Sequence, residues 1–328
     1  MKYRHGSVLL SAVLLTGLAW TGDIWAQTKI ARVGILAPSD AAGNVVAEFY
    51  EPFRGTLVQL GWIEGKNVSL EFRNARGNPP QFADAAAELV RLPVDVIFAD
   101  SAPATRAAYA ATRTIPIVGL DYTNDPIAAE YAESYGQPGR NLTGFFLDAP
   151  EFASKWLGLL KATVPDLSRV AVLWDPTPGV SHLNAIKGAA RTLSVQLQVL
   201  EVRRLDDIDK AFSAFRSRTQ ALIILPSPMT WAQSPRLAEL SMKHRLPAVS
   251  MADLFAEAGG MLSYGPDPVA ASERCAVLVA KILGGAKPGV LPVERPTKFK
   301  FIVNLKTAKA LGLTVPESIL VSADKVIR

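Results

Sequence analysis

Arg32-Val-Gly-Ile-Leu36 and Arg169-Val-Ala-Val-Leu173 are close copies of one short apolar segment. Each opens a series of four β-rich runs, at 32–36, 67–72, 95–99 and 116–120 and again at 169–173, 195–201, 221–225 and 247–250. The fourth runs also match, because both begin with an aliphatic residue and a proline, at 115–116 and 246–247. A pattern that repeats within one chain indicates two units of the same design.

The segments between these runs have helical spacing. Phe49, Phe53 and Leu57 recur at intervals of four, and Ala85 and Leu89 do the same. Short strands that alternate with helices predict βαβ units and a parallel sheet, and consecutive apolar residues are typical of strands buried on both faces. We therefore predict an α/β protein of two doubly wound parallel-sheet lobes. One large sheet is the alternative, but it explains the repetition poorly.

Extended passages are expected to carry the chain between the lobes. They lie at 139–146 and at 259–265, where the glycines 259–260 permit a hinge. A helix from 268 to 283 and a strand from 298 to 303 follow, so three crossings join the lobes in a hinged clam-shell. The expected division is 1–26 signal peptide, 27–143 plus 262–296 N-terminal lobe, and 144–261 plus 297–328 C-terminal lobe.

The N-terminus has the pattern of a secretory signal. Lys2 and Arg4 form a basic head, an apolar run spans 8–20, and Ala26 ends a segment typical of a cleavage site. The apolar run is shorter than the roughly 20 residues that a membrane-spanning helix needs. Cleavage after Ala26 leaves a periplasmic protein of 302 residues, whereas an uncleaved anchor is the alternative.

Composition excludes several classes of protein. A hydrophobic content of 49% excludes a disordered chain, and one cysteine, Cys275, excludes a disulfide scaffold or a cysteine-based metal site. We expect Cys275 to be buried and inert. A net charge of +5 gives no sign of a nucleic-acid partner. The usual catalytic motifs are missing, and His182 and His244 are expected to be surface or capping residues, so we expect neither an enzyme nor a cofactor nor a metal.

Polar and aromatic residues gather where the expected strands end. Ligands of open parallel sheets bind outside the carboxyl ends of the strands. Hydroxyls and amides at helix starts suit a carboxylate, Asp175 suits an amine, and the aromatic rings offer stacking surfaces. Taken singly, these residues are also ordinary helix caps and turns. The candidate ligand-binding residues are Pro38, Ser39, Ser101, Ala102, Asp121, Tyr122, Thr123, Trp174, Asp175, Ser227, Met251, Phe255 and Tyr264.

Several segments resemble one known family over about residues 29–328. They are Leu60-Gly-Trp-Ile-Glu-Gly-Lys-Asn-Val68, 82–90, Glu257-Ala-Gly-Gly-Met-Leu-Ser-Tyr-Gly265, 292–299 and 304–313. Together they resemble the ABC-transporter substrate-binding proteins that include the tryptophan-binding TrpX-like receptors. The resemblance implies a type I periplasmic binding protein fold, a monomer, and closure of two lobes on a small solute. It also implies delivery of that solute to an ABC permease in the inner membrane.

The resemblance also bears on individual residues. It matches Ser101-Ala102 to a loop that serves as a carboxylate cradle, and Asp125-Pro126 to an acidic turn. Asp175 stands where relatives commonly have an Asn-Pro turn, and this departure favours a cationic group on the ligand or else marks a different specificity. An amino acid or a related small carboxylate is the favoured solute.

Two other functions use the same fold. A sensory receptor would pass its closed state to a membrane sensor, and the sequence leaves this alternative open. A sugar-type transcription regulator would carry an N-terminal helix-turn-helix domain, whereas here a secretory segment occupies that place.

Overall fold

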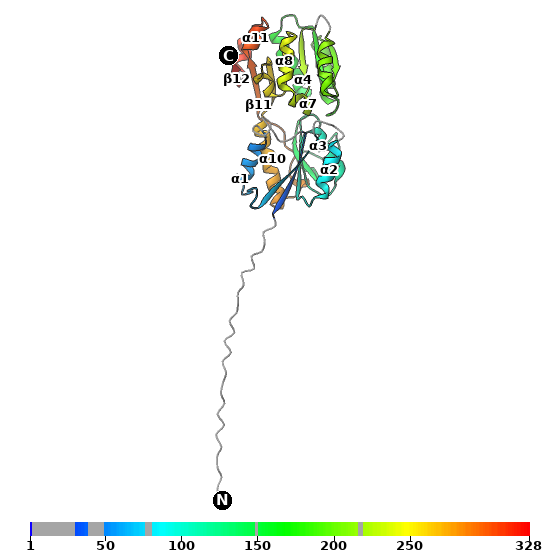
Figure 1. Cartoon of the computed structure of the whole chain (residues 1–328), viewed down its shortest axis with the longest axis vertical. Helices are drawn as coiled ribbons and strands as arrows, with labels where there is room; N and C mark the ends of the chain where they lie inside the picture. Colours follow the sequence, from blue (N-terminus) through cyan, green and yellow to red (C-terminus); the bar gives the residue numbers. More distant parts are fainter. Residues whose placement is uncertain (2–29, 39–48, 76–80, 148–149, 216–218) are drawn as a thin grey trace.

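The computed structural model describes Met1 and residues 30–38, 49–75, 81–147, 150–215 and 219–328. It has two lobes stacked along the long axis of the molecule (Figure 1), each built on its own sheet. The expected signal peptide at 1–26 lies outside the described residues, apart from Met1. In the described part of the chain, no helix combines the length and hydropathy of a membrane span.

The first lobe has a sheet in the order β2-β1-β3-β4-β5, parallel throughout. Its strands are β1 (Ala31–Ala37), β2 (Val68–Asn74), β3 (Val96–Asp100), β4 (Ile117–Asp121) and β5 (Leu142–Phe146). Its helices are α1 (Glu51–Gln59), α2 (Gln81–Arg91), α3 (Ala102–Ala111) and α10 (Pro268–Leu283), with a 3₁₀ turn η2 (Pro288–Val290). Helices α1 and α10 pack together on one face, and α2 and α3 pack on the other, as a doubly wound sheet requires.

The second lobe has a sheet in the order β12-β11-β10-β9-β8-β6-β7. Its strands are β6 (Arg169–Trp174), β7 (Gln196–Glu201), β8 (Ala221–Ile224), β9 (Ala248–Ser250), β10 (Leu262–Pro266), β11 (Phe299–Asn304) and β12 (Lys325–Ile327). Its helices are α4 (Pro150–Thr163), α5 (Ser181–Thr192), α6 (Leu205–Ser213), α7 (Pro228–Ala232), α8 (Ser234–Lys243), α9 (Asp253–Glu257), α11 (Leu305–Ala310) and α12 (Glu317–Val321). The pairing is parallel except where β11 meets β10.

Alternation along the strands explains the two cores of each lobe. In β6, Val170 and Val172 face the cluster under α4 and α5, whereas Ala171 and Leu173 face the cluster under α6 and α8. Apolar residues at consecutive positions therefore fill both faces. The predicted fold class is confirmed: two α/β lobes, each with helices on both sides of a mainly parallel sheet.

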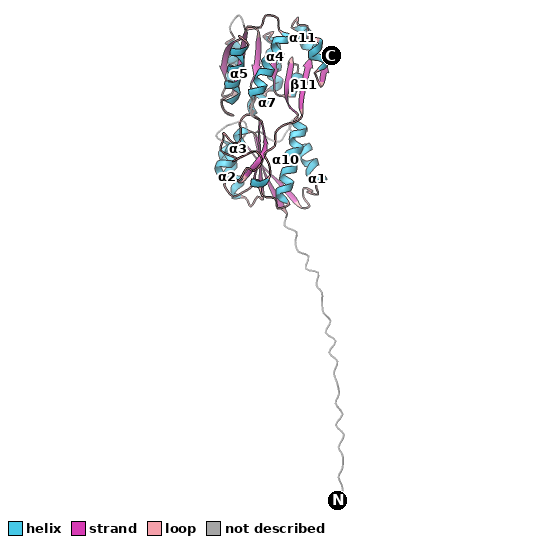
Figure 2. Cartoon of the chain, turned by 180° about the vertical axis from the view of Figure 1, so that it is seen from behind, coloured by secondary structure: helices cyan, strands magenta, loops and turns pink. Residues whose placement is uncertain are grey.

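Three segments cross between the lobes side by side, as seen from the back of the molecule (Figure 2). The Glu294 amide donates to the carbonyl of Gly144, and the Asp267 amide donates to the carbonyl of Lys298. The first two crossings come later than the expected boundaries at 143/144 and 261/262. They do so because β5 pairs along β4 up to Phe146, while β10 pairs with both β9 and β11.

Of the two glycines expected to form a hinge, Gly259 has a φ of 110° after α9, and Gly260 serves the packing of the second lobe. A Cβ atom on Gly260 would overlap the ring of Phe255, so the close approach of backbone and ring requires glycine.

His182 is another difference from the sequence prediction, because its side chain is buried against Trp156 rather than exposed. Burial lowers the pKa of His182 to about 3. Cys275 is buried in α10 as predicted, and burial raises the pKa of its thiol well above the usual range.

Candidate functional site

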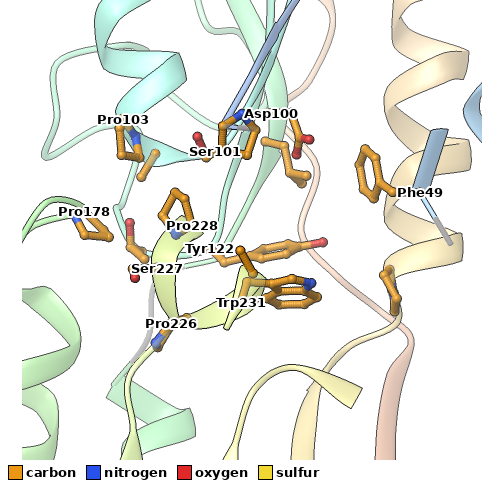
Figure 3. A pocket seen from close by; sticks show the side chains of 16 residues that line it. Phe49, Asp100, Ser101, Pro103, Tyr122, Pro178, Pro226, Ser227, Pro228 and Trp231 are labelled. Atoms are coloured by element: carbon orange, nitrogen blue, oxygen red, sulfur yellow. The ribbon is translucent and has the colours of Figure 1, made fainter. Parts of the chain in front are cut away.

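The carboxyl ends of the strands in the two lobes face one another across a pocket (Figure 3). Its volume of about 130 Å³ is comparable to that of cavities that hold a single small aromatic ring. The first lobe lines it with Pro38, Phe49, Asp100, Ser101, Ala102, Pro103, Leu120, Tyr122, Thr123 and Pro268. The second lobe lines it with Pro178, Pro226, Ser227, Pro228, Trp231 and Ala232.

Aromatic rings from both lobes form the walls. Tyr122 follows β4 and Trp231 lies in α7, and Figure 3 shows the ring of Tyr122 above the indole of Trp231. Phe49 comes from the segment before α1, where its ring stacks on Phe98 with centroids 6.1 Å apart. The hydroxyl of Ser272 in α10 donates to the Phe49 carbonyl and fixes this position. These walls suit a flat apolar ring, because aromatic pairs gain from stacking as well as from burial.

A carboxylate lies at the end of β3. Asp100 accepts a hydrogen bond from the hydroxyl of Tyr50 at 2.6 Å. Burial raises the pKa of Asp100 from 3.8 to about 6, and the hydrogen bond from Tyr50 opposes part of that rise. The same burial, with the nearby Asp100 charge, raises the pKa of Tyr50 well above its usual range. Asp100 therefore changes its charge just below neutral pH.

Ser101 links this strand to α3. Its Oγ accepts from the Ala104 amide at 3.3 Å, which makes Ser101 the N-cap of the helix. Its φ of 153° lies in a region that favours glycine, and strained backbone of this kind is held where the surrounding structure over-determines it. Pro103 in the first turn suits the helix start, because its missing N–H would have no partner inside the helix.

The second lobe presents a reciprocal cap. The Thr230 amide donates to Oγ of Ser227 at 3.0 Å, and the Ser227 amide donates to Oγ1 of Thr230 at 2.9 Å. Pro228 occupies the first turn of this helix, α7. The cap turns the chain sharply after β8, which brings Trp231 to the pocket one helical turn later.

The structure brings six of the candidate residues together at the pocket. They are Pro38, Ser101, Ala102, Tyr122, Thr123 and Ser227. Ser39 lies outside the described residues. That the six lining residues contact a ligand stays a prediction.

Two aspartates from the candidate set shape loops rather than line the pocket. Asp121 is fully buried, and its Oδ1 accepts from the amide and the hydroxyl of Thr123, both at 2.8 Å. Its Oδ2 accepts from the side-chain amide of Asn124 at 2.7 Å. Asp175 is 5% exposed and accepts from the Thr177 amide at 2.9 Å. Both are turn-forming aspartates, so the ordinary interpretation of Asp before a turn describes them.

The remaining candidates also lie away from the lining. Trp174 donates to the Gly179 carbonyl at 3.2 Å and holds the loop that carries Pro178. Phe255 and Met251 are buried in the cores of the second lobe. Tyr264 packs among Phe152, Phe299 and Phe301 beside the crossings.

Several lining residues escaped the sequence analysis. Asp100 directly precedes Ser101 at a strand end, so its position was a usable signal. Phe49 and Trp231 lie within helical sequence, where an aromatic residue more often faces a core. The residues that line the pocket without having been singled out are Phe49, Asp100, Pro103, Leu120, Pro178, Pro226, Pro228, Trp231, Ala232 and Pro268.

Asp100 makes the stability of the ligand-free protein depend on pH in a definite direction. Its pKa is higher in the folded protein than in the unfolded chain, so the folded state holds the proton more tightly between pH 3.8 and about 6. We expect the contribution of Asp100 to stability to rise as the pH falls through about 6 and to level off below 3.8. The neighbouring Tyr50, Tyr122 and Cys275 do not titrate there, because the pKa of each is raised.

The check is the urea unfolding midpoint of the wild type minus that of Asp100→Asn, measured across this pH range. We expect the difference to favour the wild type increasingly towards acid pH. A midpoint difference that does not change with pH would contradict the raised pKa of Asp100.

Comparisons with known proteins agree on one family. The model of the family described as ABC transporter substrate binding protein matches residues 40–327. A tyrosine-binding protein of Clostridioides difficile (strain R20291) is 23% identical over 265 residues, which cover 80% of this chain and 75% of that protein.

Solved structures show the same two-lobed fold. A conserved domain protein from Vibrio cholerae has a TM-score of 0.83 at 25% identity, covering 91% of this chain and 100% of that one. An ABC domain from Streptococcus pneumonia in complex with L-Trp has a TM-score of 0.82 at 23% identity, covering 90% and 99%.

Proposed function

We propose that this chain, which belongs to the ABC transporter substrate binding protein family, captures a small solute between its lobes and delivers it to the permease of an import system. The relatives reported above are binding proteins rather than enzymes. The proposed function is therefore reversible binding of a solute, accompanied by closure of the two lobes.

One observation carries the proposal: both lobes line the same pocket. A solute that touches Tyr122 of the first lobe and Trp231 of the second has contacts that exist together only when the lobes are closed. Such a ligand shifts the population towards the closed form, because it binds that form more tightly. The closed form is then the state that a permease recognises.

An amino acid is the favoured solute. One relative is named for tyrosine and one solved relative holds L-Trp. The rings of Phe49, Tyr122 and Trp231 support an aromatic side chain in the pocket of this chain. The charge pattern of the first 26 residues supports export, so we propose that the mature protein works in the periplasm.

Native mass spectrometry of the freshly purified protein tests this function. We expect a one-to-one complex with a small solute that dissociates on activation. A protein that carries no solute, and that none of the twenty amino acids stabilises against heat, would contradict the proposal. Co-purification of the loaded protein with permease subunits rather than with a membrane sensor separates transport from sensing.

Arg106 provides a direct link between the closed lobes. It lies in α3, and its Nη2 donates to the backbone carbonyl of Thr177 in the second lobe at 2.7 Å. Because the side chain is exposed, we expect Arg106→Ala to weaken L-tryptophan binding by only about fivefold, through loss of one charge-assisted hydrogen bond. Calorimetric titration measures the change.

Arg113→Ala is the matched control, since Arg113 contacts Tyr109 and the Thr112 carbonyl within its own lobe. Equal effects of the two substitutions on affinity would show that the bond to Thr177 does not stabilise the closed form.

A further inference from the structure

The backbone that lines the pocket is poor in hydrogen-bond donors. Six of its sixteen lining residues are prolines: Pro38, Pro103, Pro178, Pro226, Pro228 and Pro268. A proline has no backbone N–H, so each of these positions presents an acceptor or an apolar ring to the pocket. We propose that the pocket selects its solute by an ammonium group held at Asp100 and Tyr122, and that the solute needs no carboxylate. This proposal rests on the proposed function of the same pocket.

Helix N-termini are the usual anion sites of such folds, and here they are largely occupied. Three helices begin at the pocket, and each has a proline in its first turn. In α10 the Asp267 carboxylate accepts from the amides of Val269 and Ala270. In α3 the Oγ atom of Ser101 accepts from the Ala104 amide, and in α7 the Oγ atom of Ser227 accepts from the Thr230 amide. Only one first-turn amide each in α3 and α7, those of Ala102 and Met229, is left without a backbone or capping partner in the described chain. A carboxylate therefore meets few backbone donors at these helix starts.

The formal charge of the pocket lining is negative. Asp100 is the one formally charged residue among the sixteen that line it. Asp267 adds negative charge near Tyr122, whereas Asp253 is paired with Lys300 at 2.9 Å. The positive charge of Arg106 in α3 is directed to the facing loop, where it is bonded to the Thr177 carbonyl. On the side of the pocket where Tyr122 lies, Asp100 and Asp267 attract a cation and repel an anion.

Two polar groups beside the pocket have unused hydrogen-bonding capacity. The Tyr122 hydroxyl is buried and has no hydrogen-bond partner in the described part of the chain. The Tyr50 hydroxyl donates a hydrogen bond to Oδ2 of Asp100, and none of the described residues donates one to Oδ1. Figure 3 shows the Asp100 carboxylate and the Tyr122 hydroxyl on the side of the pocket where Phe49 lies. An ammonium group between them donates to both oxygens, and the aromatic faces stabilise its charge further.

Tyr50 acts as a positioning residue, because its hydroxyl fixes one carboxylate oxygen and leaves the other for the ligand. The inferred solute class is an aromatic molecule with a free amine. A decarboxylated amine fits this class as well as an amino acid does.

Three probes that share an indole ring test the proposal. L-tryptophan has both charged groups, tryptamine lacks the carboxylate, and indole-3-propionate lacks the ammonium. By calorimetry at pH 7.5 we expect tryptamine to bind within roughly tenfold of L-tryptophan, and indole-3-propionate to bind about 100-fold more weakly than tryptamine. Indole-3-propionate that binds as well as tryptamine overturns this proposal and leaves the proposed function intact. Failure of all three to bind overturns the aromatic-solute function, and this proposal with it.

The substitution Asp100→Asn keeps the shape of the side chain and removes its charge. We expect it to weaken tryptamine binding by about 100-fold and to leave indole-3-propionate binding unchanged or tighter. Asp175→Asn is the matched control, since Asp175 is a buried aspartate of the facing loop that does not line the pocket. If Asp175→Asn weakens tryptamine binding and Asp100→Asn does not, the ammonium site is not at Asp100. Urea unfolding of both variants shows that the comparison is made on folded protein.

Discussion

Replacing Trp231 with alanine is expected to weaken L-tryptophan binding by about 100-fold, which corresponds to ~2.7 kcal/mol. Trp231 supplies the aromatic wall of the second lobe, opposite Tyr122 of the first. Its removal takes away the stacking surface and also the contact that a bound solute needs to hold the lobes together. Interface residues of this kind, large and central, carry a disproportionate share of binding energy.

Trp62→Ala is the control for this prediction. Trp62 is similarly half-buried, but it lies in a groove at the opposite end of the first lobe, beside Ala31. Its loss is expected to leave affinity within twofold of the wild type, by the same calorimetric measurement. Comparable losses in the two variants would mean that Trp231 acts through general stability rather than through the pocket.

Gly144→Ala is expected to destabilise the protein by about 3–5 kcal/mol, near the upper end of single substitutions. Gly144 has a φ of 154° and faces Gly119 across the pairing of β4 with β5. A Cβ atom there would overlap the Gly119 carbonyl oxygen, so the two strands would have to separate. This pairing lies at the first crossing between the lobes, where Glu294 also bonds to Gly144.

Gly188→Ala is the same substitution, but we expect it to stabilise the protein rather than destabilise it. Gly188 lies in the middle of α5, and a Cβ atom there meets nothing within 4 Å. Alanine stabilises such a position by roughly 0.5–1 kcal/mol, because glycine loses more conformational freedom in a helix. Urea midpoints of both variants measure the difference. A Gly144→Ala protein as stable as the wild type would contradict the strand geometry.

The repeated motif was sufficient to predict two lobes, because buried parallel strands and amphipathic helices leave periodic patterns. The strands at the crossings were harder to place. Residues 142–146 and 262–266 are extended in either interpretation, and only their pairing partners decide which sheet they join. The terminal strand β12 has three residues and no pattern that distinguishes it from a loop.

The candidate site was predictable where residues directly follow a strand. Ser101, Tyr122 and Ser227 line the pocket for that reason. Asp175 follows a strand too, but its carboxylate turns back to the Thr177 amide, and sequence does not show the direction of a side chain. Trp231 reaches the pocket because it lies one helical turn into α7. Phe49 is held there by the hydrogen bond that its carbonyl accepts from Ser272 in α10. Such contacts arise from tertiary structure rather than from local pattern.

The most direct test is the thermal stability of protein stripped of solute by unfolding and refolding, measured alone and with each aromatic amino acid and aromatic amine. At about 100 times its Kd, a ligand that binds only the folded state adds ~2.7 kcal/mol of stability. We expect at least one member of the panel to raise Tm by several degrees in the wild type, at roughly 2–4 °C per kcal/mol, and not in Trp231→Ala. If no member raises Tm, the aromatic-solute function is wrong. If both proteins respond alike, the pocket between the lobes is not where this protein binds its solute.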